Sequence, residues 1–115
     1  MNKRLTLNEI LKLAGKVKIW MPSGRGTSAY RGYVEDVSVT IAQKSSYPNI
    51  AVKSGDCVVG EVHLYRFNHD KRVEALYQTV QRSYEQMTDA EREAAMLRDE
   101  ERRAKALARA RELIK

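Results

Sequence analysis

The hydrophobic positions of the chain change their spacing several times, and each change predicts a new element. Near the N-terminus, Thr6 and Glu9 have the spacing of a capping box, in which two side chains bond the free backbone amides at a helix start. Apolar residues then recur at helical spacing until Gly15, a residue able to take a left-handed cap. We therefore expect a short helix over residues 7–14.

From residue 16 to about residue 67, apolar positions alternate with polar ones, as in strands with one buried face. We expect four strands, over about 16–21, 30–43, 50–52 and 57–67. The second would be about 45 Å long if straight, and Val34 is out of phase with the apolar residues that follow it. This mismatch predicts a bulge or sharp bend at Glu35-Asp36.

The remainder of the chain has helical spacing. A regular apolar stripe predicts a helix over 70–86. Thr88 and Glu91 form a second capping box, so a new helix should start there and run to the C-terminus. This last helix has a poor apolar stripe of its own, and at 1.5 Å per residue it would be roughly 40 Å long. Such a helix must project into solvent or lie against another subunit, and we expect the second outcome, in a homo-oligomer.

Together these elements predict an α+β fold with a short N-terminal helix, a curved four-stranded antiparallel sheet and two C-terminal helices, the last of them long. The pattern does not decide whether the sheet closes into a barrel. A chain of 115 residues favours one domain. Within it, residues 1–69 hold the first helix and the β-meander, and residues 70–115 form a helical hairpin that serves as the oligomerisation element.

The chain is basic, with 21 Lys and Arg against 15 Asp and Glu and a net charge of +6. Residues 1–69 contain ten basic and five acidic residues, whereas residues 70–115 contain eleven and ten. The excess charge favours an anionic partner, which leaves nucleic acid, a nucleotide and an acidic protein open. A single cysteine excludes an intrachain disulfide, and no apolar run reaches the length of a membrane span. We expect a cytoplasmic protein without membrane contact, in the host cytoplasm if it is viral.

Residues with catalytic potential do not converge in the sequence pattern. Cys57, Glu61 and His63 share one face of the last expected strand, but six residues of strand separate the thiol from the imidazole by about 20 Å. Nothing nearby completes a metal site. We therefore predict no enzymatic activity, no catalytic or metal-binding residue and no cofactor.

The most suggestive chemistry lies in the loop at residues 23–28. Gly24 and Gly26 allow the backbone to approach a ligand closely, hydroxyls and amides can donate to phosphate oxygens, and Arg25 adds a charged fork. Aromatic and basic side chains that could stack on a base surround the loop, namely Trp20, Tyr30, Arg31 and Tyr33. The alternatives are an ordinary hairpin loop and aromatics that belong to the core or rim of the sheet.

The last helix offers a second candidate for phosphate binding. Arg98, Arg102, Lys105 and Arg109 recur every three or four residues and align as one basic stripe. The alternative is a solvated helix stabilised by ion pairs such as that of Asp99 with Arg103, four residues apart.

The order of elements, a curved antiparallel sheet followed by two helices of which the last is long, resembles the phage Thoeris anti-defence sponge proteins. Those proteins sequester a cyclic ADP-ribose isomer, and in some cases cyclic oligonucleotides, at subunit interfaces without degrading it. The resemblance implies a nucleotide-binding phage protein that blocks host immunity by ligand sequestration. It rests on architecture, so it transfers no binding residue to this chain.

Two other functions remain open from the sequence. The short helix followed by a bent sheet is also similar to Sm-like small barrels, whose rings bind RNA, although the fifth strand usual in that barrel is not visible in the pattern. The third possibility is a phage inhibitor that binds a host protein through its sheet edge or its last helix.

Overall fold

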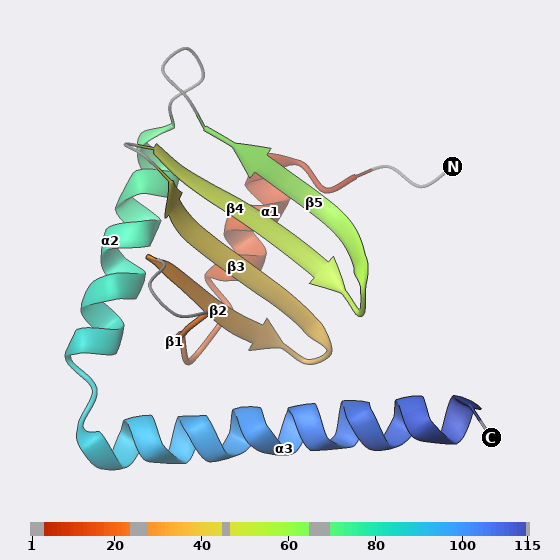
Figure 1. Cartoon of the computed structure of the whole chain (residues 1–115). Helices are drawn as coiled ribbons and strands as arrows, with labels where there is room; N and C mark the ends of the chain where they lie inside the picture. Colours follow the sequence, from red (N-terminus) through yellow and green to blue (C-terminus); the bar gives the residue numbers. More distant parts are fainter. Residues whose placement is uncertain (1–3, 24–27, 45–46, 65–69, 115) are drawn as a thin grey trace. The chain divides into compact units, whose positions relative to one another are not determined.

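The computed structural model describes residues 4–23, 28–44, 47–64 and 70–114. In chain order its elements are α1 (Leu7–Ala14), β1 (Met21–Pro22), β2 (Ala29–Val34), β3 (Val37–Lys44), β4 (Tyr47–Ser54), β5 (Cys57–His63), α2 (Lys71–Glu85) and α3 (Asp89–Ile114) (Figure 1). The chain forms two compact units, Met1–Glu85 and Gln86–Lys115. Helix α2 therefore groups with the sheet, whereas the sequence pattern grouped it with the last helix.

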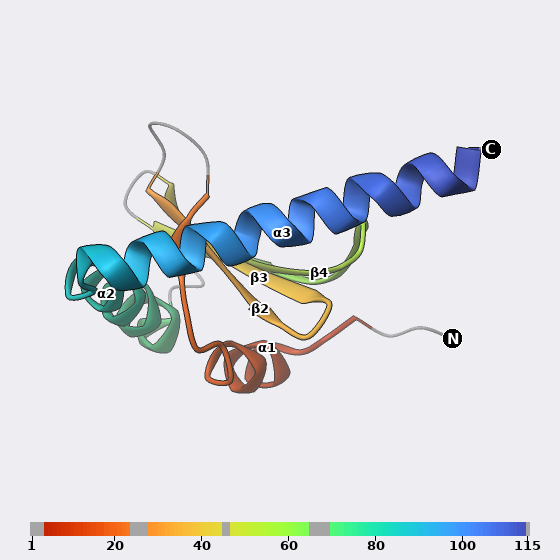
Figure 2. The same cartoon turned by 90° about the horizontal axis from the view of Figure 1, so that it is seen from below.

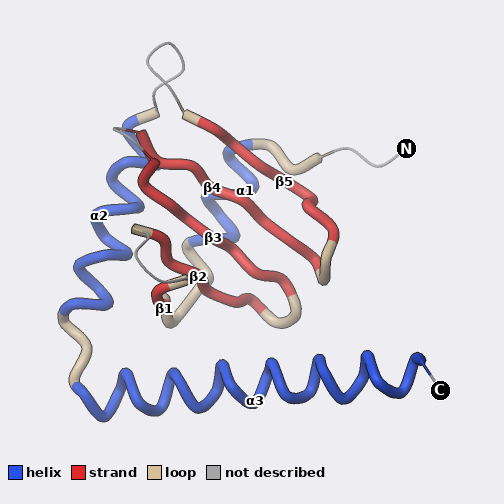
Figure 3. The backbone as a smooth tube through the Cα atoms, viewed as in Figure 1, coloured by secondary structure: helices blue, strands red, loops and turns tan. Residues whose placement is uncertain are grey.

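The first unit is built on a five-stranded antiparallel sheet in the order β1-β2-β3-β4-β5, with no crossover between strands (Figure 3). Helices α1 and α2 both lie on one face of this sheet (Figure 2). Within the described residues β1 does not pair with β5, so the sheet is open and not a barrel. The predicted α+β class is confirmed, but the sheet has five strands where four were expected.

The additional strand comes from the bend expected at Glu35-Asp36, which is a complete hairpin turn. Val34 pairs with Val37, so the two strands β2 and β3 are joined by two residues only. Glu35 has a φ of 54°, in the left-handed region. The sequence pattern does not reveal this hairpin, because a Glu-Asp pair lacks the Gly or Asn that marks such turns.

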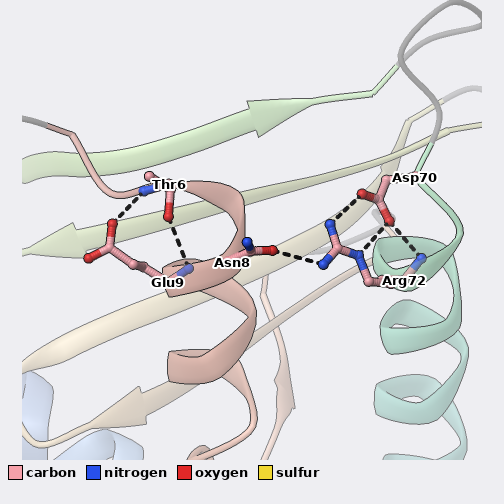
Figure 4. Close-up of polar contacts among 5 residues, drawn as sticks. All are labelled: Thr6, Asn8, Glu9, Asp70 and Arg72. Atoms are coloured by element: carbon pink, nitrogen blue, oxygen red, sulfur yellow. Dashed lines mark hydrogen bonds and ion pairs between the residues drawn. The ribbon is translucent and has the colours of Figure 1, made fainter.

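Helix α1 has the predicted bounds and the predicted capping box. The Glu9 amide donates to Thr6 Oγ1 at 3.2 Å, and the Thr6 amide donates to Glu9 Oε1 at 2.9 Å (Figure 4). The expected left-handed cap is wrong, because Gly15 has a φ of −65°. The helix instead ends in a tighter turn, with the amides of Lys16 and Val17 bonded to carbonyls three residues earlier.

The segment after α1 crosses the helix-covered face of the sheet over Gly32. A Cβ at Gly32 would lie 2.1 Å from Val17 Cγ1 and 3.2 Å from the Ile19 carbonyl oxygen, so only glycine leaves room for the crossing. Pairing with β2 is limited to Met21 and Pro22. The strand expected over 16–21 is therefore wrong for most of its length, because tertiary packing outweighs the alternating pattern.

The hydrophobic core lies between α1, α2 and the face of the sheet that they cover. Its buried members are Ile10, Ala14, Trp20, Val39, Ile41, Ile50, Val52, Leu64, Val73, Tyr77 and Val80. A register shift after Val52 inserts an extra residue into β5, and Val59 packs against the core as a result. Strict alternation along β5 would place Val59 on the opposite face.

The second unit contains one long helix, as expected from its capping box. The Glu91 amide donates to Thr88 Oγ1 at 3.1 Å, and α3 then runs for 26 residues. The predicted ion pair between Arg103 and Asp99 is present at 3.1 Å. In the parts of the chain that the structure describes, none of the helices combines the length and the apolar character that a bilayer crossing requires.

Candidate ligand-binding face

The face of the sheet opposite α1 and α2, here called the second face, carries two of the candidate binding residues, Arg31 and Tyr33. Strand register places Arg31 beside Thr40, Thr40 beside Ala51, and Ala51 beside Glu61. Small side chains therefore occupy the middle strands, and charged side chains stand on β2 and β5. Such a surface suits a flat ligand held by polar groups at its edges.

Arg31 is held in a defined position on this face. Its Nη2 donates to Ser23 Oγ at 2.9 Å in a partly buried contact. A guanidinium has five N–H donors in a rigid fork, so one bond to a hydroxyl orients the group and leaves it the capacity to bind an anion as well.

Ser23 also marks one end of the Gly-rich loop, and the ends of that loop are firmly anchored. The Ser23 amide donates to the Ala29 carbonyl at 2.9 Å, and the Gln43 amide donates to the Ser28 carbonyl at 2.9 Å. The Tyr77 hydroxyl of α2 donates to the same Ser28 carbonyl at 3.1 Å. The base of the loop therefore lies next to the Arg31 guanidinium. The predicted site residues Gly24, Arg25 and Gly26 lie outside the described residues.

Two of the predicted aromatic residues belong to the core side. Trp20 is only 5% exposed, which leaves its ring no free face for a base. Tyr30 lies on the face opposite Arg31, because successive strand residues alternate. Its ring packs against Tyr77 and Tyr84, with centroids 6.0 Å and 5.9 Å away. Burial raises the pKa of the Tyr30 hydroxyl, in agreement with this packed environment.

Tyr33 is the aromatic residue that the fold does bring to the second face. It stands two residues from Arg31 on β2 and pairs with Ser38, which in turn pairs with Lys53 of β4. The two-residue spacing along a strand could have identified Tyr33, and not Tyr30, as the neighbour of Arg31. The described part of the site therefore contains a guanidinium and a phenol ring on β2, and an ammonium group on β4 across the intervening strand β3.

The basic stripe of the last helix belongs to the second unit. Arg102, Lys105 and Arg109 are all exposed on α3. At about 100° per residue they lie on the side of the helix opposite Met96 and Leu107. The role of the stripe in binding an anion stays a prediction.

The residues considered for catalysis do not form a catalytic group. Cys57 and His63 are the first and last residues of β5, and His63 contacts Glu61 through Nε2. Among the described residues, no group of three His, Cys, Asp or Glu side chains could hold a metal ion. The absence of enzymatic activity stays a prediction.

A second polar cluster connects α1 to α2 and has a structural role. Arg72 donates to Asn8 Oδ1 at 2.8 Å and to Asp70 Oδ2 at 2.9 Å (Figure 4). Asp70 Oδ1 also accepts the Arg72 amide at 2.8 Å, which caps the start of α2. The hydrogen bonds and charge of Asp70 raise the pKa of Arg72. These groups satisfy one another, so the cluster positions two helices and does not suggest a ligand site.

Comparisons with protein families, with curated proteins and with solved structures found no match to this chain.

Proposed function

We propose that the chain is a non-enzymatic binding protein that sequesters a phosphate-bearing nucleotide signal on the second face of its sheet. The observation that carries the proposal is the hydrogen bond that holds the Arg31 guanidinium beside the base of the Gly-rich loop. A guanidinium fork matches the geometry of a phosphate, and loop amides and hydroxyls can add further donors. The net charge of +5 over residues 1–69 favours the same class of ligand.

The remaining residues of the face fit a nucleotide better than a free phosphate. Tyr33 offers an aromatic ring on the same strand face as Arg31, and Lys53 adds a second positive charge two strands away. Ser38 and Thr40 between them are small and polar. A cyclic ADP-ribose isomer or a cyclic oligonucleotide combines phosphates with bases in this way. In a phage protein, sequestration of such a signal would block host immunity.

Calorimetric titration with cyclic ADP-ribose and with a panel of cyclic dinucleotides tests the proposal. Loss of one charge-assisted contact costs about 1.5–3 kcal/mol, so Arg31→Ala should weaken binding by roughly 10- to 150-fold. Arg82→Ala is the matched control, because Arg82 is exposed on α2, away from the second face. Equal affinities for the wild type, Arg31→Ala and Arg82→Ala would contradict the proposal, as would the absence of binding to the whole panel.

A second candidate is RNA binding of the Sm-like type. The observation that favours it is the run of five antiparallel strands after an N-terminal helix, since five strands are usual in that barrel. The open sheet, in which β1 and β5 do not pair within the described residues, argues against it. A salt titration separates the two functions: affinity for single-stranded RNA falls steeply with salt through counterion release, whereas a small ligand held by a few directed contacts depends on salt far less.

A further inference from the structure

Helix α3 has one apolar line along its surface, here called the seam. Met96, Leu107 and Ile114 are 51%, 53% and 83% exposed in the chain. At about 100° per residue, these three side chains fall within about 20° of one another around the helix axis. A single chain therefore leaves a straight row of large apolar side chains in contact with water.

Two charged residues and an alanine complete the seam. Glu100 and Arg103 lie between Met96 and Leu107, and Ala110 lies between Leu107 and Ile114. The steps along the seam are four, three, four, three and four residues, which is the heptad spacing of a coiled coil. Its centre is thus a pair of opposite charges, with Met96 on the N-terminal side and Leu107, Ala110 and Ile114 on the C-terminal side.

We infer that α3 pairs with α3 of a second copy of the chain in antiparallel orientation, with Glu100 of each copy opposite Arg103 of the other. In this register Met96 of each copy also meets Leu107 of the other. The midpoint of α3 (Asp89–Ile114) falls between residues 101 and 102, which is also the midpoint between Glu100 and Arg103. The charge pairing and the complete overlap of both helices therefore require the same register.

Other arrangements of the same seam place charges badly. A parallel pair in register sets Glu100 against Glu100 and Arg103 against Arg103, which are like charges in direct opposition. An antiparallel pair shifted by one heptad sets Arg103 against Leu107, so the second copy offers the guanidinium no counter-charge beyond the ion pair that it has with Asp99 of its own helix. Polar residues at seam positions commonly select one register in this way, at some cost in stability.

Residues beside the seam also fit the antiparallel register. Leu97, which is 56% exposed, would lie near Ala104 of the second copy, a large side chain beside a small one. Arg102, Lys105 and Arg109 would remain on the outer side of the pair. The inference is independent of the proposed function, because it involves no residue of the second face.

Sedimentation equilibrium over a concentration series tests the pairing by charge reversal. The wild type should reach twice the 13.2 kDa of the chain. Glu100→Arg and Arg103→Glu should each weaken dimerisation by at least about tenfold, because each places like charges opposite one another. An equimolar mixture of these two variants, and the double variant carrying both changes, should restore it.

The matched controls change charge on the outer side of the helix. Glu101→Arg and Arg98→Glu make the same substitutions at about 140° and 200° from Met96 around the helix axis, and they should leave the dissociation constant unchanged. Circular dichroism measures whether each variant keeps the helix content of the wild type. A wild type that is monomeric throughout, reversals without effect, or a double variant that fails to dimerise would each overturn the inference.

Disulfide trapping tests the orientation separately. In a Cys57→Ser background, a chain with Met96→Cys should cross-link to a chain with Leu107→Cys and only poorly to itself. Preferential formation of the disulfide between two Met96→Cys chains would show a parallel pair and contradict the register.

Discussion

At the residue scale, Glu35 and Gly55 occupy equivalent positions in two hairpin turns of the sheet, between β2 and β3 and between β4 and β5. Both are the first residue of a two-residue turn, with φ values of 54° and 64°. A Cβ at Gly55 would meet no atom within 4 Å, so the effect of a substitution there is confined to the backbone. Substitutions at these two positions therefore measure how much a side chain in the left-handed conformation lowers the free energy of unfolding.

The pair predicts stability changes of opposite sign. Gly55→Ala should lower the free energy of unfolding by about 1–2 kcal/mol, because a side chain strains this conformation. Glu35→Gly should raise it by about 0.5–1 kcal/mol, since relief of strain exceeds the added entropy of the unfolded chain. Urea denaturation of both variants measures these differences, and destabilisation by Glu35→Gly would contradict the turn geometry.

Gly32 leads to a prediction about packing. Gly32→Ala should destabilise the protein by about 1–3 kcal/mol or more, because the new methyl group collides with Val17. Gly60→Ala is the milder comparison, with its nearest contact at 3.0 Å to Leu5 Cβ. The double variant Gly32→Ala, Val17→Ala should lose less free energy of unfolding than the sum of the losses in the two single variants. Purely additive losses in denaturation experiments would show that the two side chains do not meet.

At the element scale, local chemistry predicted the helices and failed at two strands. Capping boxes identified the starts of α1 and α3 because the bonds that form them span three residues and need no tertiary contact. The hairpin at Glu35 has no such local mark, and the path of residues 16–20 depends on the space above Gly32, which is distant in sequence. Alternation within β2 did contain the information that Tyr30 and Arg31 face opposite ways.

The cap of α1 predicts a pH dependence. Hydrogen bonds from the Thr6 backbone, and then from its side chain, lower the pKa of Glu9 from its usual value near 4.5. A carboxyl whose pKa is lower in the folded state stabilises the protein above its unfolded pKa, and this contribution is lost as the pH falls through the folded pKa. The stability difference between the wild type and Glu9→Gln should therefore change below about pH 4.5. A difference independent of pH would contradict this account.

At the scale of the whole molecule, the two units of the chain carry different candidate surfaces. The first carries the sheet whose second face holds Arg31 and Tyr33, and the second carries a helix suited to pair with a copy of itself. The sequence identified the residue types of the candidate site, but not which of them share a face, since that requires the core side to be known. For this reason the sequence does not separate Trp20 and Tyr30, which lie on the core side, from Arg31 and Tyr33.

Native mass spectrometry of protein purified from cells that produce a cyclic nucleotide signal tests whether the chain holds an intact ligand on its second face. Wild type should retain an added mass equal to the intact signal molecule, and Arg31→Ala, isolated in the same way, should lose most of it. The intact mass also checks that the ligand is held and not degraded. Wild type without added mass, a mass corresponding to a cleaved ligand, or equal retention by Arg31→Ala would contradict sequestration at the second face.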